Sequence, residues 1–142
     1  MKDGPERLLV NDYIARAQTA GKRLGYREVE ETELPASSRE DEARRLLARH
    51  GEGVLVCLDE RGEGVTSQAL SQRLARWRDA GEAAVSFVIG GADGLGAGLI
   101  AQARQRISFG VQTWPHRLVR VMIAEQIYRA LSIEAGSPYH RE

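Results

Sequence analysis

Two stretches of the sequence decide the fold: VSFVIGGADGLGAG at residues 85–98 and ISFGVQTWPHRLVRVMIAEQIYR at residues 107–129. Their pattern is typical of strand, glycine-rich turn, helix, strand, loop and helix, in that order. Open α/β sheets bind ligands outside the carboxyl ends of their strands. We therefore predict a cofactor site built from both loops. The glycines just past these strand ends are Gly90, Gly91, Gly94, Gly96, Gly98 and Gly110.

The rest of the chain alternates between helical and extended patterns. We expect helices at residues 5–20, 39–50 and 118–133, and a further helix from a cap at Thr66 or Ser67 to residue 80. We expect strands at residues 26–34, 53–58 and 83–89, with a loop at 59–64. The two continuous apolar runs are typical of strands buried on both faces. Together these elements predict an α/β fold: a mostly parallel sheet flanked by helices, beginning on a helix.

The composition predicts one soluble domain over residues 1–142. Twenty basic and twenty acidic residues give a net charge of zero. No apolar run approaches the ~20 residues that span a bilayer, and the start lacks the apolar core of a signal peptide. The chain has one cysteine, Cys57, and so cannot form an internal disulfide, which favours the cytoplasm. Cys57 lies in an apolar strand pattern, where we expect a buried, inert thiol.

Charge is distributed unevenly along the chain. Zero net charge argues against holding RNA by bulk electrostatics alone. Residues 104–142, however, contain six arginines against three glutamates, and arginine suits phosphate recognition. The terminal Tyr139, His140 and Arg141 are residue types that stack on bases and bind phosphates, although a frayed terminus is the alternative.

The glycine-rich connection lacks both common phosphate-binding motifs. The dinucleotide fingerprint is matched only as Gly96-x-Gly98-x-x-Ala101, which begins several residues after the strand. No acidic residue follows at a strand end where a ribose needs one, and no Gly-Lys-Ser/Thr occurs. We therefore expect an uncharged or zwitterionic cofactor, with simple turn formation as the alternative.

Each of the other candidate functional features has two interpretations. Asp59 either binds a ligand hydroxyl or amine, or caps a turn. His116 either lies at the cofactor site or is a solvated residue at a helix start. The helix at 118–133 is apolar on more than one face, which suits either a dimer interface or a central helix. No His, Cys, Asp or Glu set has metal-ligand spacing, so we expect no metal.

Several long motifs resemble one family. These are residues 87–95 (FVIGGADGL), 114–121 (WPHRLVRV), 125–130 (EQIYRA) and the terminal YHRE at 139–142, with similarity also at 58–62 and 4–7. They are similar to the ribosomal RNA large-subunit methyltransferase H family, pseudouridine N3-methyltransferases of the SPOUT superfamily. The resemblance covers essentially the whole chain.

The resemblance implies a SPOUT-type fold with a C-terminal trefoil knot at about residues 85–135, an exception to the rule that chains are unknotted. It implies a homodimer that uses S-adenosyl-L-methionine to methylate N3 of a pseudouridine in a 23S rRNA stem-loop on the assembled ribosome. Tyr139, His140 and Arg141 become candidates for substrate binding or proton handling, with Arg120 and Arg129 orienting the tail or the RNA. The implied cofactor-binding residues are Leu58, Gly91, Gly110, Val111, Gln112, Thr113, Trp114 and Pro115, with Gly90 and His116 as added neighbours.

One feature departs from the family pattern. Family members begin with an apolar strand before the segment that matches residues 2–7. Either the start codon is placed late, or the first family strand is absent here. Loss of that strand predicts an exposed sheet edge and lower stability. Two alternatives to an active methyltransferase remain at this point: a non-catalytic RNA- or ribosome-binding domain of the same fold, and a nucleotide-binding oxidoreductase, which the glycine spacing disfavours.

Overall fold

The computed structural model describes residues 3–35, 37–90 and 94–140. The chain forms two compact units. We call residues 1–33, 66–78 and 117–142 the helical unit, and residues 34–65 and 79–116 the sheet unit. The expected single SPOUT domain spans both units and stays a prediction, as does the knot.

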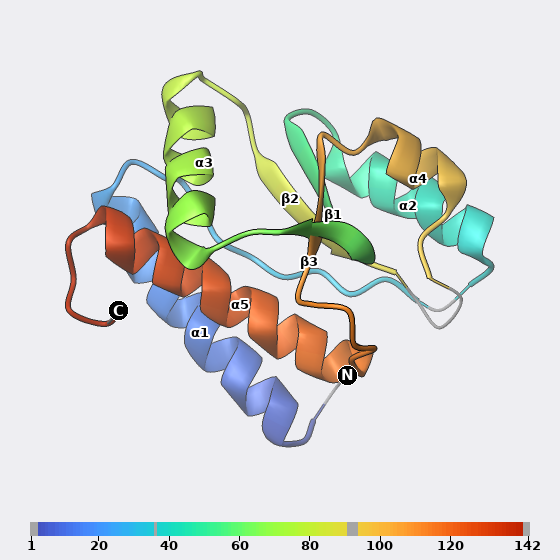
Figure 1. The fold of residues 1–142 in the computed structure, drawn as a ribbon, viewed down its shortest axis with the longest axis horizontal. Helices are drawn as coiled ribbons and strands as arrows, with labels where there is room; N and C mark the ends of the chain where they lie inside the picture. The colour runs from blue at the N-terminus through green and yellow to red at the C-terminus, as the bar shows by residue number, and fades with distance from the viewer. Residues whose placement is uncertain (1–2, 36, 91–93, 141–142) are drawn as a thin grey trace. The chain divides into compact units, whose positions relative to one another are not determined.

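The sheet unit is built on three parallel strands, β1 (Val54–Gly64), β2 (Val85–Ile89) and β3 (Gln105–Ser108). Their order is β2-β1-β3, so β1 is central (Figure 1). Val54 to Val56 are buried, as the continuous apolar run predicts. The predicted α/β class with a parallel sheet and helices is confirmed.

Two helices, α2 (Arg39–His50) and α4 (Ala97–Gln102), pack with the sheet in this unit. Ser38 caps α2, because its side chain accepts a hydrogen bond from the Asp41 N–H at 3.2 Å. The core that joins helices to strands consists of Ala43, Leu55, Cys57, Val88 and Leu99.

The helical unit contains α1 (Pro5–Arg23), most of α3 (Ser67–Asp79) and α5 (His116–Glu134). In Figure 1, α1 (blue) and α5 (red) run side by side, in agreement with the close approach of Gly21 to Leu131. The Ser71 hydroxyl donates to the Ala130 carbonyl at 2.7 Å and joins α3 to α5. The predicted cap at Thr66 is confirmed by a 3.0 Å bond from the Ala69 N–H.

The predicted strand at 26–34 is wrong, because these residues form neither helix nor strand. Their side chains and backbone bind the helices instead of a neighbouring strand. Gln18 of α1 accepts the Val29 N–H at 2.7 Å. Glu31 pairs with Arg7 of α1 at 2.5 Å and with Arg120 of α5 at 3.3 Å. An acidic segment that neutralises two arginines is stabilised without a β ladder.

The predicted loop at 59–64 is also wrong, because β1 continues through Gly64. Leu58 and Glu63 both pair with Ile107, so the register of β1 against β3 shifts between them. The strand thus bends and then pairs again with β3, which sequence periodicity does not reveal. The remaining differences are at the ends of elements: α1 extends to Arg23, β2 begins at Val85, and α5 begins at His116.

Gly62 gives a test of this second pairing. A Cβ on Gly62 would lie 2.6 Å from the Arg106 carbonyl carbon and 2.8 Å from the Ile107 nitrogen. We expect Gly62→Ala to lower the free energy of unfolding by about 1–3 kcal/mol, because backbone atoms must move. Gly64→Ala is the matched control, since nothing lies within 4 Å of its Cβ position. Urea denaturation of both variants measures the difference, and equal stabilities would contradict the close approach.

Candidate functional site

The pairing of β1 with β2 and β3 brings the predicted cofactor segments to one edge of the sheet unit. Leu58 pairs with Ile89 of β2 and with Ile107 of β3. Gly90 directly follows β2, and the loop 110–115 follows β3 after Phe109. Because Leu58 is level with the last residue of β2 and the last but one of β3, Leu58, Gly90 and this loop converge at the carboxyl edge of those two strands. Gly91 lies outside the described residues.

The turn after β2 depends on the small size of Gly90. A Cβ there would lie 2.6 Å from the Gly94 carbonyl carbon, 2.7 Å from the Gly94 oxygen and 2.8 Å from the Leu95 nitrogen. Gly94 has φ +80°, a value that L side chains rarely adopt. Gly90 therefore permits a close approach of backbone atoms, and Gly94 permits a left-handed backbone conformation.

Short polar contacts fold the loop after β3. The Gly110 N–H donates to the Ser108 hydroxyl at 3.0 Å, and the Thr113 hydroxyl donates to the Glu60 carboxylate at 3.2 Å. The Trp114 indole N–H donates to the Phe109 carbonyl at 3.3 Å. Residues 110–116 are all exposed, and Val111 is 94% exposed. The loop therefore has a defined shape and presents its side chains and backbone to the outside of the unit.

The Asp59 carboxylate at this edge is bound by Arg106 of β3. The Arg106 guanidinium donates to Asp59 Oδ2 from Nη2 at 2.6 Å and from Nε at 3.1 Å, and the Arg61 N–H donates to Oδ1 at 3.2 Å. The last of these bonds forms the turn cap that was one interpretation of Asp59. Arg106 thus has its charge neutralised by Asp59, which makes it a poor phosphate ligand.

The ion pair lowers the pKa of Asp59. Partial burial alone would raise it, but the bonds from Arg61 and Arg106 outweigh burial. The ion pair therefore stabilises the folded protein fully above the pKa of aspartate in the unfolded chain, which is about 4. This stabilisation is lost as the pH falls through the lower pKa of Asp59 in the folded protein. We expect Asp59→Asn to cost about 1–2 kcal/mol at neutral pH. The difference from the parent protein should shrink below about pH 4, which urea denaturation at several pH values would measure.

Cys57 is fully buried in the core, as predicted. Burial, assisted by the nearby Asp59 charge, raises its pKa to about 11. The thiol is therefore protonated at neutral pH and does not serve as a nucleophile.

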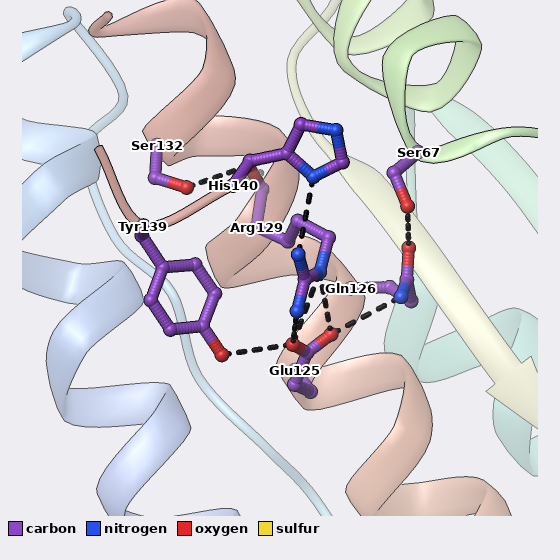
Figure 2. A network of polar contacts seen from close by, with 7 residues as sticks. All are labelled: Ser67, Glu125, Gln126, Arg129, Ser132, Tyr139 and His140. Atoms are coloured by element: carbon purple, nitrogen blue, oxygen red, sulfur yellow. Dashed lines mark hydrogen bonds and ion pairs between the residues drawn. The ribbon is translucent and has the colours of Figure 1, made fainter. Parts of the chain in front are cut away.

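The C-terminal tail lies in the helical unit. Tyr139 and His140 both contact α5: Tyr139 through Glu125, and His140 through Arg129 (Figure 2). The structure thus brings two of the three predicted tail residues together, and Arg141 lies outside the described residues. Arg120 binds the acidic residues Glu31 and Glu33 rather than the tail.

Sequence reasoning did not single out Glu125 and Arg106, although each holds a predicted site residue. A signal for Glu125 exists in the sequence, because Glu125 and Arg129 are four residues apart on one helix and can form an ion pair. No comparable local signal joins Arg106 to Asp59, which is 47 residues away.

Comparison with known proteins decides the family. The family described as "Predicted SPOUT methyltransferase" matches residues 1–140. The chain belongs to the SPOUT methyltransferase family. The convergence of Leu58, Gly90 and the 110–115 loop is accordingly the candidate methyl-donor site of a SPOUT methyltransferase.

Individual SPOUT relatives are similar over nearly the whole chain. The ribosomal RNA large subunit methyltransferase H of Hyphomonas neptunium is 53% identical, with 99% of this chain and 93% of the relative covered. Proteins of the same name from Dinoroseobacter shibae and Bradyrhizobium sp. BTAi1 are 47% and 46% identical, with the same coverage.

The described residues contain neither a metal-ligand cluster nor a membrane-spanning helix. Residues 3–35, 37–90 and 94–140 contain no group of three His, Cys, Asp or Glu side chains placed to hold a metal ion. No helix in the same residues is long and apolar enough to cross a membrane.

Proposed function

We propose that this chain transfers a methyl group from S-adenosyl-L-methionine to N3 of a pseudouridine in a 23S rRNA stem-loop, on the assembled ribosome and in the cytoplasm. The observation that carries the proposal is the meeting of Leu58, Gly90 and the 110–115 loop at one strand edge. The family match supports methyl transfer. The names of the relatives support large-subunit rRNA as the substrate.

The residues at the strand edge fit this cofactor. S-adenosyl-L-methionine carries no phosphate, and the arginine beside the edge, Arg106, is already paired with Asp59. Leu58 is apolar and buried at 9% exposure, and we assign it packing on the adenine ring. The exposed backbone of the 110–115 loop can hydrogen-bond the polar groups of the cofactor. We assign cofactor binding to Leu58, Gly90, Gly91, the loop and its neighbour His116.

The bound cofactor supplies an electrophilic methyl group on a sulfonium sulfur. The chain has to hold the methyl group and N3 in line and to assist the loss of the N3 proton. We assign substrate binding or proton handling to Tyr139, His140 and Arg141. When the cofactor is bound, its methyl group would pass from sulfur to N3, and these residues would help the N3 proton to pass to solvent.

We also propose that the active form is a homodimer. Large apolar side chains are exposed in the loop and at the start of α5: Val111 at 94%, Leu118 at 42% and Trp114 at 36%. Exposed apolar groups of this size are common at interfaces. Light scattering should give about twice the chain mass of 15.7 kDa; the mass of one chain would contradict the dimer.

Incubation with methyl-labelled S-adenosyl-L-methionine tests the function. Assembled ribosomes, free 23S rRNA and ribosomes lacking pseudouridine would be compared, and the product identified by nuclease digestion and mass spectrometry. We expect N3-methylpseudouridine only in the assembled ribosomes. Calorimetry with the cofactor is the second measurement. Binding without turnover would favour a non-catalytic domain, and no heat with the cofactor would contradict the proposal.

A further inference from the structure

Residues 59–62 of β1 form a bulge beside the candidate cofactor site. Leu58 and Glu63 both pair with Ile107 of β3, so the ladder between β1 and β3 skips the four residues that separate them. Bulges are frequent next to functional sites, where they turn a side chain in a new direction. We call residues 59–62 the β1 bulge and ask which side chain it directs, and to what.

Two contacts hold the β1 bulge against β3. Arg106 of β3 donates to the Asp59 carboxylate at 2.6 Å and 3.1 Å. At the other end of the bulge, Gly62 lies so close to β3 that an added Cβ would be 2.6 Å from the Arg106 carbonyl carbon. Glu60 lies between these two anchors. Its backbone is therefore fixed relative to β3 and to the segment that follows β3.

Glu60 contacts that segment at two points. Its carboxylate accepts the Thr113 hydroxyl at 3.2 Å, and its backbone carbonyl lies 3.2 Å from the Ser108 hydroxyl. The Ser108 hydroxyl has a single proton, and the Gly110 carbonyl is nearer to it, at 2.7 Å. The bond from Thr113 is therefore the stronger link between the bulge and the 110–115 loop, and it is the link that a substitution of Glu60 removes.

The 110–115 loop depends on such links for its shape. Its residues are all exposed, so burial does not fix their conformation. A loop that must become ordered when it binds a ligand loses conformational entropy, and the affinity falls accordingly. A hydrogen bond that already holds the loop in its binding conformation removes part of that cost.

We propose that Glu60 is a positioning residue for cofactor binding: through the Thr113 hydroxyl, its carboxylate holds the 110–115 loop in the conformation that binds S-adenosyl-L-methionine. The identity of the ligand rests on the proposed function. The effect of Glu60 on the shape of the loop rests on the contacts alone, and the residues that make them all belong to the sheet unit.

Calorimetry of the full-length protein with S-adenosyl-L-methionine tests whether Glu60 acts through Thr113. We expect Glu60→Ala to raise Kd by about three- to tenfold, the effect of losing one hydrogen bond. In a Thr113→Val background the same substitution should change Kd by no more than about twofold, because the hydroxyl that Glu60 holds is already absent. Equal effects in the two backgrounds would overturn the proposal. Glu52→Ala removes an exposed acid of the same unit and is the matched control, with an unchanged Kd.

Glu60→Gln distinguishes a hydrogen bond from a charge. Glutamine keeps an acceptor oxygen for the Thr113 hydroxyl but lacks the negative charge, which would attract the cationic sulfonium directly. We expect Glu60→Gln to recover most of the affinity, with Kd within about twofold of the parent value. A loss as large as that of Glu60→Ala would overturn the positioning role and indicate direct attraction of the cofactor.

The Trp114 indole reports the shape of the loop without any cofactor. Its N–H donates to the Phe109 carbonyl at 3.3 Å and gives a separate signal in nitrogen-correlated NMR. The chain has two tryptophans, so the signal that disappears in Trp114→Phe belongs to Trp114. We expect Glu60→Ala and Thr113→Val to shift this signal, and Glu52→Ala to leave it in place. An unshifted Trp114 signal in Glu60→Ala would overturn the proposal.

The two measurements distinguish failure of this inference from failure of the proposed function. If the parent protein binds no S-adenosyl-L-methionine, the proposed function fails, and the role of Glu60 in cofactor binding fails with it. The Trp114 signal then still decides whether Glu60 holds the loop. If the parent protein binds the cofactor and Glu60→Ala binds it equally well, the positioning role fails and the proposed function stands.

Discussion

Gly90→Ala should weaken cofactor binding and methyl transfer by about 100-fold, because it displaces the turn between β2 and the cofactor site. The added Cβ would lie 2.6–2.8 Å from three backbone atoms of Gly94 and Leu95. Backbone atoms cannot rotate away as a long side chain can, so the turn itself must move. Calorimetry with S-adenosyl-L-methionine and a ribosome methylation assay would measure the two losses.

The same glycine-rich connection contains a matched control. Gly98 lies in α4, and nothing lies within 4 Å of its Cβ position. We expect Gly98→Ala to bind cofactor normally and to gain about 0.5–1 kcal/mol of stability, because alanine favours helix. Circular dichroism would establish that both variants are folded. A folded Gly90→Ala protein with normal binding would contradict the role assigned to this turn.

Leu99→Ala should lower the free energy of unfolding by about 2–5 kcal/mol. Leu99 is fully buried in the sheet-unit core, where it packs with Leu55, Cys57 and Val88. Truncation removes apolar contacts and leaves a cavity under α4, the helix that follows the glycine-rich connection. We therefore expect cofactor binding to weaken as well, by more than the loss of folded protein alone explains.

Leu99→Met tests whether the loss of side-chain volume, rather than the substitution as such, destabilises the protein. Methionine keeps most of the side-chain volume, so the cost should stay below about 1.5 kcal/mol. Urea denaturation measured at equilibrium would compare the two variants with the parent. A Leu99→Ala cost below that of Leu99→Met would contradict the placement of Leu99 in the core.

The sequence predicted most of the sheet unit correctly because its strands carry local signals. The apolar runs before Leu58 and Gly90 are typical of buried strands, and parallel pairing then brings their ends to one edge. The predictions for residues 26–34 and 59–64 failed for a different reason. At residues 26–34 the acidic side chains pair with distant arginines, as Glu31 does with Arg120. At residues 59–64 the backbone pairs with a distant strand, as Glu63 does with Ile107.

The family and the proposed position of its cofactor came from motifs that are continuous in the chain, around Gly90 and Trp114. Local sequence determines these because turn geometry and strand ends depend on a few adjacent residues. Only the tertiary structure decided that Asp59 neutralises Arg106, and that Glu125 and Arg129 bind Tyr139 and His140. Such contacts depend on the positions of side chains from separate elements.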